Sequence, residues 1–314
     1  MRTLVSQLQS KVGTEVTLYL TLEVLRDQKH LQFILGKDHT GTIQLVVSKS
    51  KVAGHEEVSQ LLPGSAFIVK GTAVQTQQSK TFGIEIQVFE IKIVSKAEPY
   101  PITQESSIDL RFDYRAVDLR FPRQQLMLRV KSAFEQGCRE FMLQKGLTEV
   151  QTPKLISRAS ESGSEVFKVE YFGETAYLAQ SPQEAKQLLC QALDSVFMVS
   201  DVYRAESSFS TRHLTQFTGI DCEVCWIFET EELMQFEEEM LMYAFSKLEP
   251  YSEEVKKLYG IELPTKPTVC KMTLAQAKQI LKEKAGMSLS AEKDLPDEGE
   301  RMLYEILGID LIFI

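Results

Sequence analysis

In the printed sequence, residues 202–226 read VYRAESSFSTRHLTQFTGIDCEVCW. Both ends of this segment are rich in the β-branched and aromatic residues that favour strands, and a polar stretch rich in Ser, Thr and charge separates them. Arg204 is a bidentate phosphate donor, and Glu206, two residues further on, would share its face of the strand. The segment therefore predicts a hairpin that clasps an anion and sets an acceptor for an amine beside it.

The far side of the predicted loop adds to this anion site. Arg212 and His213 would bring positive charge against a polyphosphate, and Phe217 offers a flat surface for a base. A salt-bridged hairpin at the protein surface would contain the same residue types. An isolated Arg-x-Glu favours that simpler interpretation, so the residue pattern alone leaves both open.

Around the hairpin, the composition is that of a soluble globular protein with room for two domains. Of its 314 residues, 43% are hydrophobic and 25% are charged. No apolar run approaches the roughly 20 residues that span a bilayer, and the N-terminal MRTLVSQLQS lacks the apolar core of a secretory signal. We therefore expect a cytoplasmic protein with no membrane contact.

The five cysteines are odd in number and thinly spread, which predicts reduced thiols instead of a disulfide framework. Cys222 and Cys225 have the spacing of half a zinc site. Residues three apart in a strand point to opposite faces, however, and no second pair completes a tetrahedron. Zinc is therefore not expected.

Charge is unevenly distributed along the chain. The net charge of −9 argues against a nucleic-acid partner, because Lys and Arg drive phosphate binding. Residues 1–100, however, hold 11 Lys and Arg against 9 Asp and Glu. The N-terminal part is thus the better candidate for contacting RNA, although so small an excess also fits an ordinary solvated surface.

The N-terminal part, residues 1–98, carries a repeated strand pattern. The runs with alternating apolar residues are Val16–Val24, Leu31–Leu35, Ile43–Val47, Ala66–Val69 and Ile84–Val94. A short helix is expected at His55–Leu62, between the third and fourth strands. Five strands with a helix at that point are typical of the OB-fold, a common oligonucleotide binder. Another small β-barrel is the alternative.

Residues 99–120, with two prolines close together, lack hydrophobic periodicity and predict a linker. From 121 to 314 we expect an α+β domain built on an antiparallel sheet. Its first helix starts at Pro122 and is closed by Gly146. Further helices are expected at Gln183–Gln191 and Glu231–Leu248, after Thr273 and from Asp297, and strands at Thr148–Thr152, Glu165–Val169, Ala176–Ala179, Val196–Val202 and Phe217–Trp226.

Three segments together resemble a known family. The sequence YRAE at 203–206 followed by RHLT at 212–215 resembles motif 2 of class II aminoacyl-tRNA synthetases in its aspartyl form. GLTEVQTPKLIS at 146–157 resembles motif 1, and residues 160–187 are similar to the amino-acid-binding stretch of the aspartyl enzymes of the archaeal and eukaryotic type. The resemblance implies an OB-fold anticodon-binding domain followed by a class II catalytic domain.

The resemblance also implies roles for single residues, with Arg204 and Glu206 as the catalytic pair. The residues that would bind ATP are Arg204, Ala205, Glu206, Arg212, His213, Leu214 and Phe217. Those that would bind aspartate are Glu161, Gln180, Gln183, Lys186, Arg204 and Asp221, and Glu223 would help to hold Mg²⁺. In the barrel, the anticodon bases of tRNA would meet Phe33, Gln44 and Glu85.

The implied function is an aspartate–tRNA ligase that activates aspartate with ATP and transfers it to tRNA(Asp), with tRNA(Asn) left open as a second acceptor. Motif 1 implies a homodimer with Pro153 in the interface. A synthetase relative that binds tRNA or dimerises without aminoacylating is the alternative. An ammonia-dependent asparagine synthetase would share the ligase fold but would leave the barrel unexplained.

The sequence also departs from the family pattern. Gln216, Phe209 and Thr211 stand where the family usually has Glu, Asn and His in motif 2, and residues 184–185 differ as well. Motif 3, with its ATP-clamping Arg, is absent from residues 1–314. We therefore expect this polypeptide alone to have little aminoacylation activity, whereas a full-length parent would be a ligase.

Overall fold

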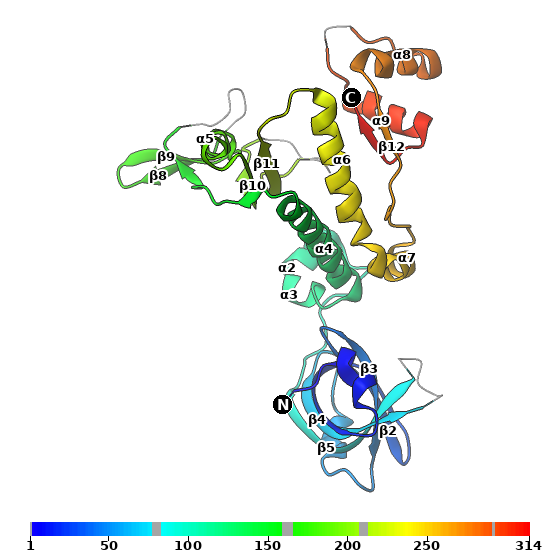
Figure 1. The fold of residues 1–314 in the computed structure, drawn as a ribbon. Coiled ribbons are helices and arrows are strands. Elements are labelled where there is room, and N and C mark those ends of the chain that lie inside the picture. The colour runs from blue at the N-terminus through cyan, green and yellow to red at the C-terminus, as the bar shows by residue number, and fades with distance from the viewer. Residues whose placement is uncertain (1, 77–82, 159–165, 207–212, 291–292) are drawn as a thin grey trace. The chain divides into compact units, whose positions relative to one another are not determined.

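A computed structural model describes residues 2–76, 83–158, 166–206, 213–290 and 293–314 (Figure 1). The chain divides into two compact units, residues 1–118 and 119–314. Each unit has its own hydrophobic core, as expected for a chain of this length.

The first unit is a closed five-stranded barrel whose strands are β1 (Glu15–Asp27), β2 (Leu31–Asp38), β3 (Gly41–Ser48), β4 (Ala66–Gln75) and β5 (Ile84–Ser95). They close in the order β1-β2-β3-β5-β4, with only the β3–β5 pairing parallel. The five predicted strands and the barrel are confirmed.

The short helices of this unit depart from expectation. Helix α1 (His55–Val58) ends four residues before the predicted Leu62. Pro63 disfavours the helical conformation only in Leu62, and after Val58 the chain continues in turns in which the amides of Gln60 and Leu61 donate to the carbonyls three residues earlier. A 3₁₀ helix, η1 (Val5–Lys11), precedes the barrel, and α2 (Ile108–Asp113) and α3 (Arg115–Asp118) lie within the stretch expected to be a linker.

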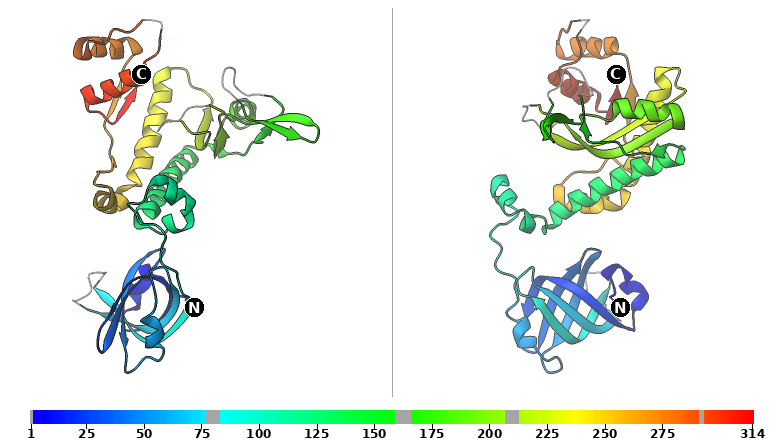
Figure 2. Two further views of the ribbon diagram at one scale, coloured as in Figure 1. Left: turned by 180° about the vertical axis from the view of Figure 1, so that it is seen from behind. Right: turned by 90° about the vertical axis from the view of Figure 1, so that its left-hand side faces the viewer.

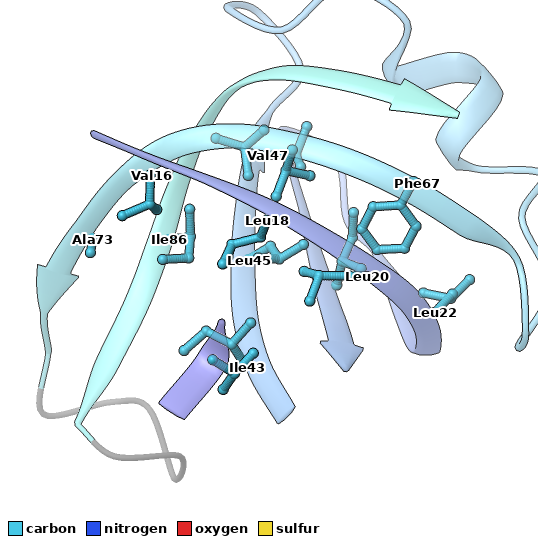
Figure 3. Packing of buried hydrophobic residues seen from close by; sticks show 14 of the residues in the cluster. Val16, Leu18, Leu20, Leu22, Ile43, Leu45, Val47, Phe67, Ala73 and Ile86 are labelled. Atoms are coloured by element: carbon cyan, nitrogen blue, oxygen red, sulfur yellow. The ribbon is translucent and has the colours of Figure 1, made fainter. Parts of the chain in front are cut away.

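Strict alternation along the strands builds the barrel core (Figure 3). Leu18, Leu45 and Ile86 are fully buried, and the residues directly before and after each of them on its strand face outward. Each such side chain contributes roughly 1.5–3 kcal/mol by leaving water. At Gly71, beside a shift in the β4–β5 register, an added Cβ would lie 2.6 Å from the carbonyl oxygen of Gln87. The two strands can therefore approach closely only because this residue is glycine.

The second unit is organised around an antiparallel hairpin of β10 (Ser195–Tyr203) and β11 (Gln216–Val224), joined by β6 (Thr148–Glu149) in parallel with β10. The helices α4 (Pro122–Gln144) and α6 (Thr230–Ser246) supply much of its core. Figure 2 shows α4 running along the sheet. The predicted strand Thr148–Thr152 is wrong in extent: its paired residues end at Glu149, with one further backbone bond from the amide of Val150 to the carbonyl of Phe197 at 2.9 Å. Pro153, which has no amide hydrogen, cannot extend the ladder.

A second small sheet has the order β7-β9-β8. Its strands are β7 (Leu155–Ile156), β8 (Lys168–Tyr171) and β9 (Glu174–Leu178), and α5 (Gln183–Leu193) follows them. Glu165, the first residue of one predicted strand, lies outside the described residues, and the strand itself begins at Lys168.

The C-terminal part contains η2 (Glu249–Tyr251), α7 (Ser252–Tyr259), α8 (Leu274–Ala285), α9 (Asp297–Leu307) and a parallel pair, β12 (Val269–Lys271) with β13 (Leu311–Phe313). Thr273 caps α8 as predicted, since its side chain accepts from the amide of Gln276. Within the described ranges, no helix is both long and apolar enough to cross a membrane.

Candidate functional site

The hairpin β10–β11 has two chemically different faces. Its alternate residues Phe197, Val199 and Ile220 pack with α4 and α6 in the core. Strand alternation therefore turns the intervening residues to the opposite face. Phe217, Asp221 and Glu223 lie on this opposite face. In the pairing register they are across from Val202, Met198 and Val196, respectively. This face carries the candidate site.

Lys186 on α5 is the centre of the site. Its Nζ lies 3.3 Å from Oδ1 of Asp221 and 3.7 Å from Oε2 of Glu223, and it donates to the backbone oxygen of Cys222 at 3.2 Å. The side chain is 4% exposed, so the charge is balanced inside the protein and not by water. Gln183, one helical turn earlier, donates its amide to Glu223 at 3.2 Å. Four residues that the family resemblance named thus form one hydrogen-bonded group.

Gln180 and Lys154 border this group through the backbone. The amide of Ala179 donates to the carbonyl of Lys154 at 2.9 Å, and the amide of Tyr203 donates to the carbonyl of Ala179 at 3.0 Å. These bonds tie the segment before α5 to the end of β10. Gln180 is 1% exposed and follows directly.

Lys154 is a residue of this site that sequence reasoning missed. Its Nζ donates to Oγ of Ser200 at 2.7 Å, on the hairpin face that carries Asp221. Burial lowers the pKa of Lys154, and the carboxylates of Asp221 and Asp201 oppose that shift. The only sequence signal was its position directly after Pro153 in the segment resembling motif 1.

The end of the hairpin that was predicted to bind phosphate begins where β10 ends. Arg204 and Glu206 were expected on one strand face, but this prediction is wrong because the register ends at the pair Tyr203–Gln216. The Arg204 amide adds one further bond, to the carbonyl of Thr215 at 3.0 Å. Its guanidinium carbon lies 5.8 Å from the centre of the Phe217 ring. The cation and the flat aromatic surface are therefore adjacent.

The remaining predicted ligands are distributed as follows. Ala205 and Glu206 are partly exposed, whereas His213 and Leu214 are exposed. Gln216, where the family usually has Glu, donates its amide to Asp201 at 3.2 Å. Glu161, Phe209, Thr211 and Arg212 lie outside the described residues.

The metal prediction concerns Glu223. Among the residues that the structure describes, no group of three or more His, Cys, Asp or Glu could hold a metal ion. Glu223 contributes one carboxylate, which already accepts a hydrogen bond from Gln183. Such a donor set fits only an ion that, like Mg²⁺ bound to a nucleotide, takes most of its ligands from phosphates and water.

A second constellation lies on the outer face of the barrel. The amide of Gln44 on β3 donates to Oε2 of Glu85 on β5 at 3.2 Å, and the two residues are paired in register. Phe33 on β2 is half-exposed, and its register partner in β1 is Arg26. Arg26 was not predicted, although the register of the β1–β2 hairpin is the signal that finds it. The face combines an aromatic ring, a cation and paired polar groups.

Comparisons with known proteins agree with this architecture. The family model for class II tRNA synthetases (D, K and N) matches residues 107–313. An aspartate–tRNA(Asp/Asn) ligase of Thermus thermophilus is 34% identical over the whole chain, which covers 74% of that protein. An aspartate–tRNA(Asp) ligase of Pyrococcus abyssi is 32% identical over 96% of the chain, which covers 72% of that protein.

Among solved structures, asparaginyl-tRNA synthetase from Pyrococcus horikoshii, complexed with asparaginyl-adenylate, has a TM-score of 0.88 and 28% identity. The similarity covers 98% of this chain and 72% of that one. A barrel followed by a hairpin that carries a buried charged group is thus the arrangement found in relatives that are tRNA ligases. The chain belongs to the class II tRNA synthetases of the D, K and N group.

Proposed function

We propose that the protein is an aspartate–tRNA ligase. It would join aspartate to ATP, giving aspartyl-adenylate and pyrophosphate, and then move the aspartyl group to the 3′ end of tRNA. The observation that carries this proposal is the buried Lys186, grouped with Gln183, Asp221 and Glu223 on the same hairpin face as Phe217. A lysine there is a point charge for the side-chain carboxylate of aspartate.

The binding roles follow from the charges. Asp221 would pair with the ammonium of aspartate instead of with Lys186. Lys186 would then be available to pair with the side-chain carboxylate of the substrate. Gln180, buried next to Lys154, would complete the aspartate pocket. The pocket thus exchanges an internal ion pair for two pairs with the substrate, and the total charge balance is kept.

At the other end of the hairpin, Arg204 would bind the α-phosphate and Phe217 would stack on the adenine. Glu206 would accept from the adenine amine, and His213 would meet the outer phosphates. Arg212 would meet the outer phosphates together with His213, and Glu161 would bind aspartate. Glu223 would supply one carboxylate to Mg²⁺, which contributes charge neutralisation of the phosphates when bound.

The barrel would read the tRNA anticodon. Phe33 would stack on an unstacked base, and Gln44 and Glu85 would hydrogen-bond base edges. Arg26, beside Phe33, would hold the backbone phosphates. tRNA(Asp) is the proposed partner, and tRNA(Asn) stays open as a second acceptor. Replacing Phe33 by Ala should weaken binding of an anticodon stem-loop by about 1–3 kcal/mol, the usual worth of one stacked base.

A homodimer through the segment resembling motif 1 is part of the proposal. Leu143 at the end of α4 and Leu155 within the segment are 52% and 45% exposed, which leaves apolar surface there to be covered. Sedimentation equilibrium of the chain tests it, with a dimer expected. The protein would be located in the cytoplasm, where tRNA is charged.

Asparagine is the second candidate substrate, favoured by the similarity to an asparaginyl enzyme with a TM-score of 0.88. The two amino acids differ in one group, a carboxylate or a neutral amide. A pocket with Lys186 favours the carboxylate, because once Asp221 pairs with the substrate ammonium an amide would leave the buried cation with only Glu223, at 3.7 Å, as a charged partner.

Calorimetry with two adenylate analogues, in which a sulfamoyl group replaces the phosphate, separates the candidates. We expect the aspartyl analogue to bind at least about tenfold more tightly than the asparaginyl one, a difference of about 1.4 kcal/mol. The reverse preference would overturn the substrate assignment. Aspartate-dependent ATP–pyrophosphate exchange by a protein that contains motif 3 as well as residues 1–314 then separates a ligase from a relative that binds without catalysing.

A further inference from the structure

Two cysteines meet beside the pocket without a part in the proposed chemistry. Cys190 on α5 and Cys225, the residue after β11, have their Sγ atoms 2.9 Å apart. A disulfide bond is about 2.05 Å long, so bond formation requires the sulfurs to approach by only about 1 Å. Cys190 is 5% exposed and Cys225 is partly exposed. One cysteine of the pair is therefore partly exposed and the other is buried.

The backbone holds both residues in place. The carbonyl of Asp194 accepts from the Cys190 thiol at 2.7 Å and from the Cys225 amide at 3.1 Å. Asp194 and Trp226 both have φ near +62°, a conformation that non-glycine residues rarely adopt and that surrounding structure must enforce. Burial, followed by the contact with Cys225, raises the pKa of the Cys190 thiol to about 11. The backbone thus holds the two sulfurs in a fixed geometry.

The other three cysteines are placed differently. Cys222 packs against α4 on the opposite face of the hairpin, as strand alternation predicts. Cys138 is fully buried in the same core, and Cys270 lies in β12. Among the cysteines in the described part of the chain, Cys190 and Cys225 are the one pair whose sulfurs are in contact.

We propose that Cys190 and Cys225 are a reversible redox modification site, at which an oxidised low-molecular-weight disulfide such as glutathione disulfide converts the two thiols to one intramolecular disulfide. The Cys225 thiolate attacks the oxidant, forming a mixed disulfide and expelling one glutathione thiolate. The Cys190 thiol then loses its proton and attacks Sγ of Cys225, expelling the second thiolate. Two electrons pass to glutathione, and two protons leave.

The cross-link would bear directly on the pocket. Lys186 lies one helical turn before Cys190 on α5, and Glu223 lies two residues before Cys225. Oxidation therefore links α5 covalently to the end of β11. The cross-link lies close to the Lys186–Glu223 pair, in which Nζ and Oε2 are 3.7 Å apart. Formation of the disulfide does not depend on the proposed function, and its test needs no activity measurement.

The experiment incubates the native chain with mixtures of oxidised and reduced glutathione, blocks the remaining thiols and digests with trypsin without reduction. Cleavage after Lys186, Arg204, Arg212 and Lys247 gives peptides 187–204 and 213–247. We expect these two peptides to be joined and three of the five thiols to remain free. The native chain should need at least about a tenfold lower ratio of oxidised to reduced glutathione than the chain in urea.

Matched variants identify the sulfurs. Because peptide 213–247 contains both Cys222 and Cys225, the variant Cys222→Ser must keep the cross-link, whereas Cys225→Ser and Cys190→Ser must lose it. Circular dichroism confirms that each variant is folded. Glutathione remaining on Cys225 without a cross-link, or a cross-link that survives in Cys190→Ser, overturns the proposal. Equal oxidation in native buffer and in urea does so as well.

Discussion

Replacing Lys186 by Met tests whether the site is built around one buried cation. Methionine keeps the length and packing of the side chain but removes the charge. Asp221 and Glu223, each with a side chain 27% exposed, would then face each other's negative charge without Lys186 between them. Gln183 would remain as a donor to Glu223.

The magnitude follows from the partial burial of the two acids. Removing one partner of a buried ion pair costs about 3–5 kcal/mol, and the exposure of the two carboxylates places the loss near the lower end, at about 3 kcal/mol. For a unit of this size that corresponds to a melting temperature lower by roughly 6–12 °C.

Urea unfolding followed by fluorescence of Trp226, the only tryptophan of the chain, measures this loss in the second unit. The double variant Lys186→Met with Asp221→Asn should recover part of it, because one of the stranded carboxylates becomes neutral. A loss below about 0.5 kcal/mol, or strictly additive effects of the two changes, would refute the reasoning, since surface pairs behave in that way.

Three further predictions concern packing, pH and oxidation. Gly137→Ala should lower stability by about 1–3 kcal/mol in urea, because the added Cβ would lie 2.8 Å from the Ala244 Cα; unchanged stability contradicts the α4–α6 contact. Burial raises the pKa of Cys138 from 9.0 to about 11, so its neutral thiol stabilises the fold below pH 9, and this contribution is lost as pH rises to 11; thermal melts of Cys138→Ala should lack that decline. The Cys190–Cys225 disulfide should raise the free energy of unfolding by about 4 kcal/mol, and its reduction should remove this gain. Equal stability of the oxidised and reduced forms would argue against the cross-link.

The strand pattern was the most predictable part of the fold. In the barrel, alternation of apolar residues gave all five strands, because one face of each is buried against a single core. The hairpin β10–β11 was equally readable, and its period of two puts Phe217, Asp221 and Glu223 on one face. Helix α8 was found from its cap, a local signal at Thr273.

Long-range contacts could not be predicted in this way. Lys154 reaches Ser200 because β7 pairs with β9 and brings the segment after Pro153 against the hairpin, a pairing of only two residues. The contact between Cys190 and Cys225 joins residues 35 apart in sequence. The parallel strands β12 and β13 have three residues each, too few for a periodic pattern.

Helix α7 shows a different limit. Its eight residues, Ser252–Tyr259, lie between Pro250 and Gly260. A helix this short is marginal in isolation, so packing against its neighbours decides whether it forms. The roles of single site residues came from resemblance to a family, since a lysine or a carboxylate in a short segment fits many surfaces.

The most direct test of the central claim is a crystal structure of the chain with the sulfamoyl analogue of aspartyl-adenylate. The account predicts that the adenine stacks on Phe217 and that the aspartyl carboxylate lies within hydrogen-bonding distance of Nζ of Lys186. Asp221 should then accept from the ligand ammonium. A ligand bound away from the hairpin face would contradict the account. So would a ligand whose side-chain carboxylate pairs with another group while Lys186 and Asp221 remain paired with each other.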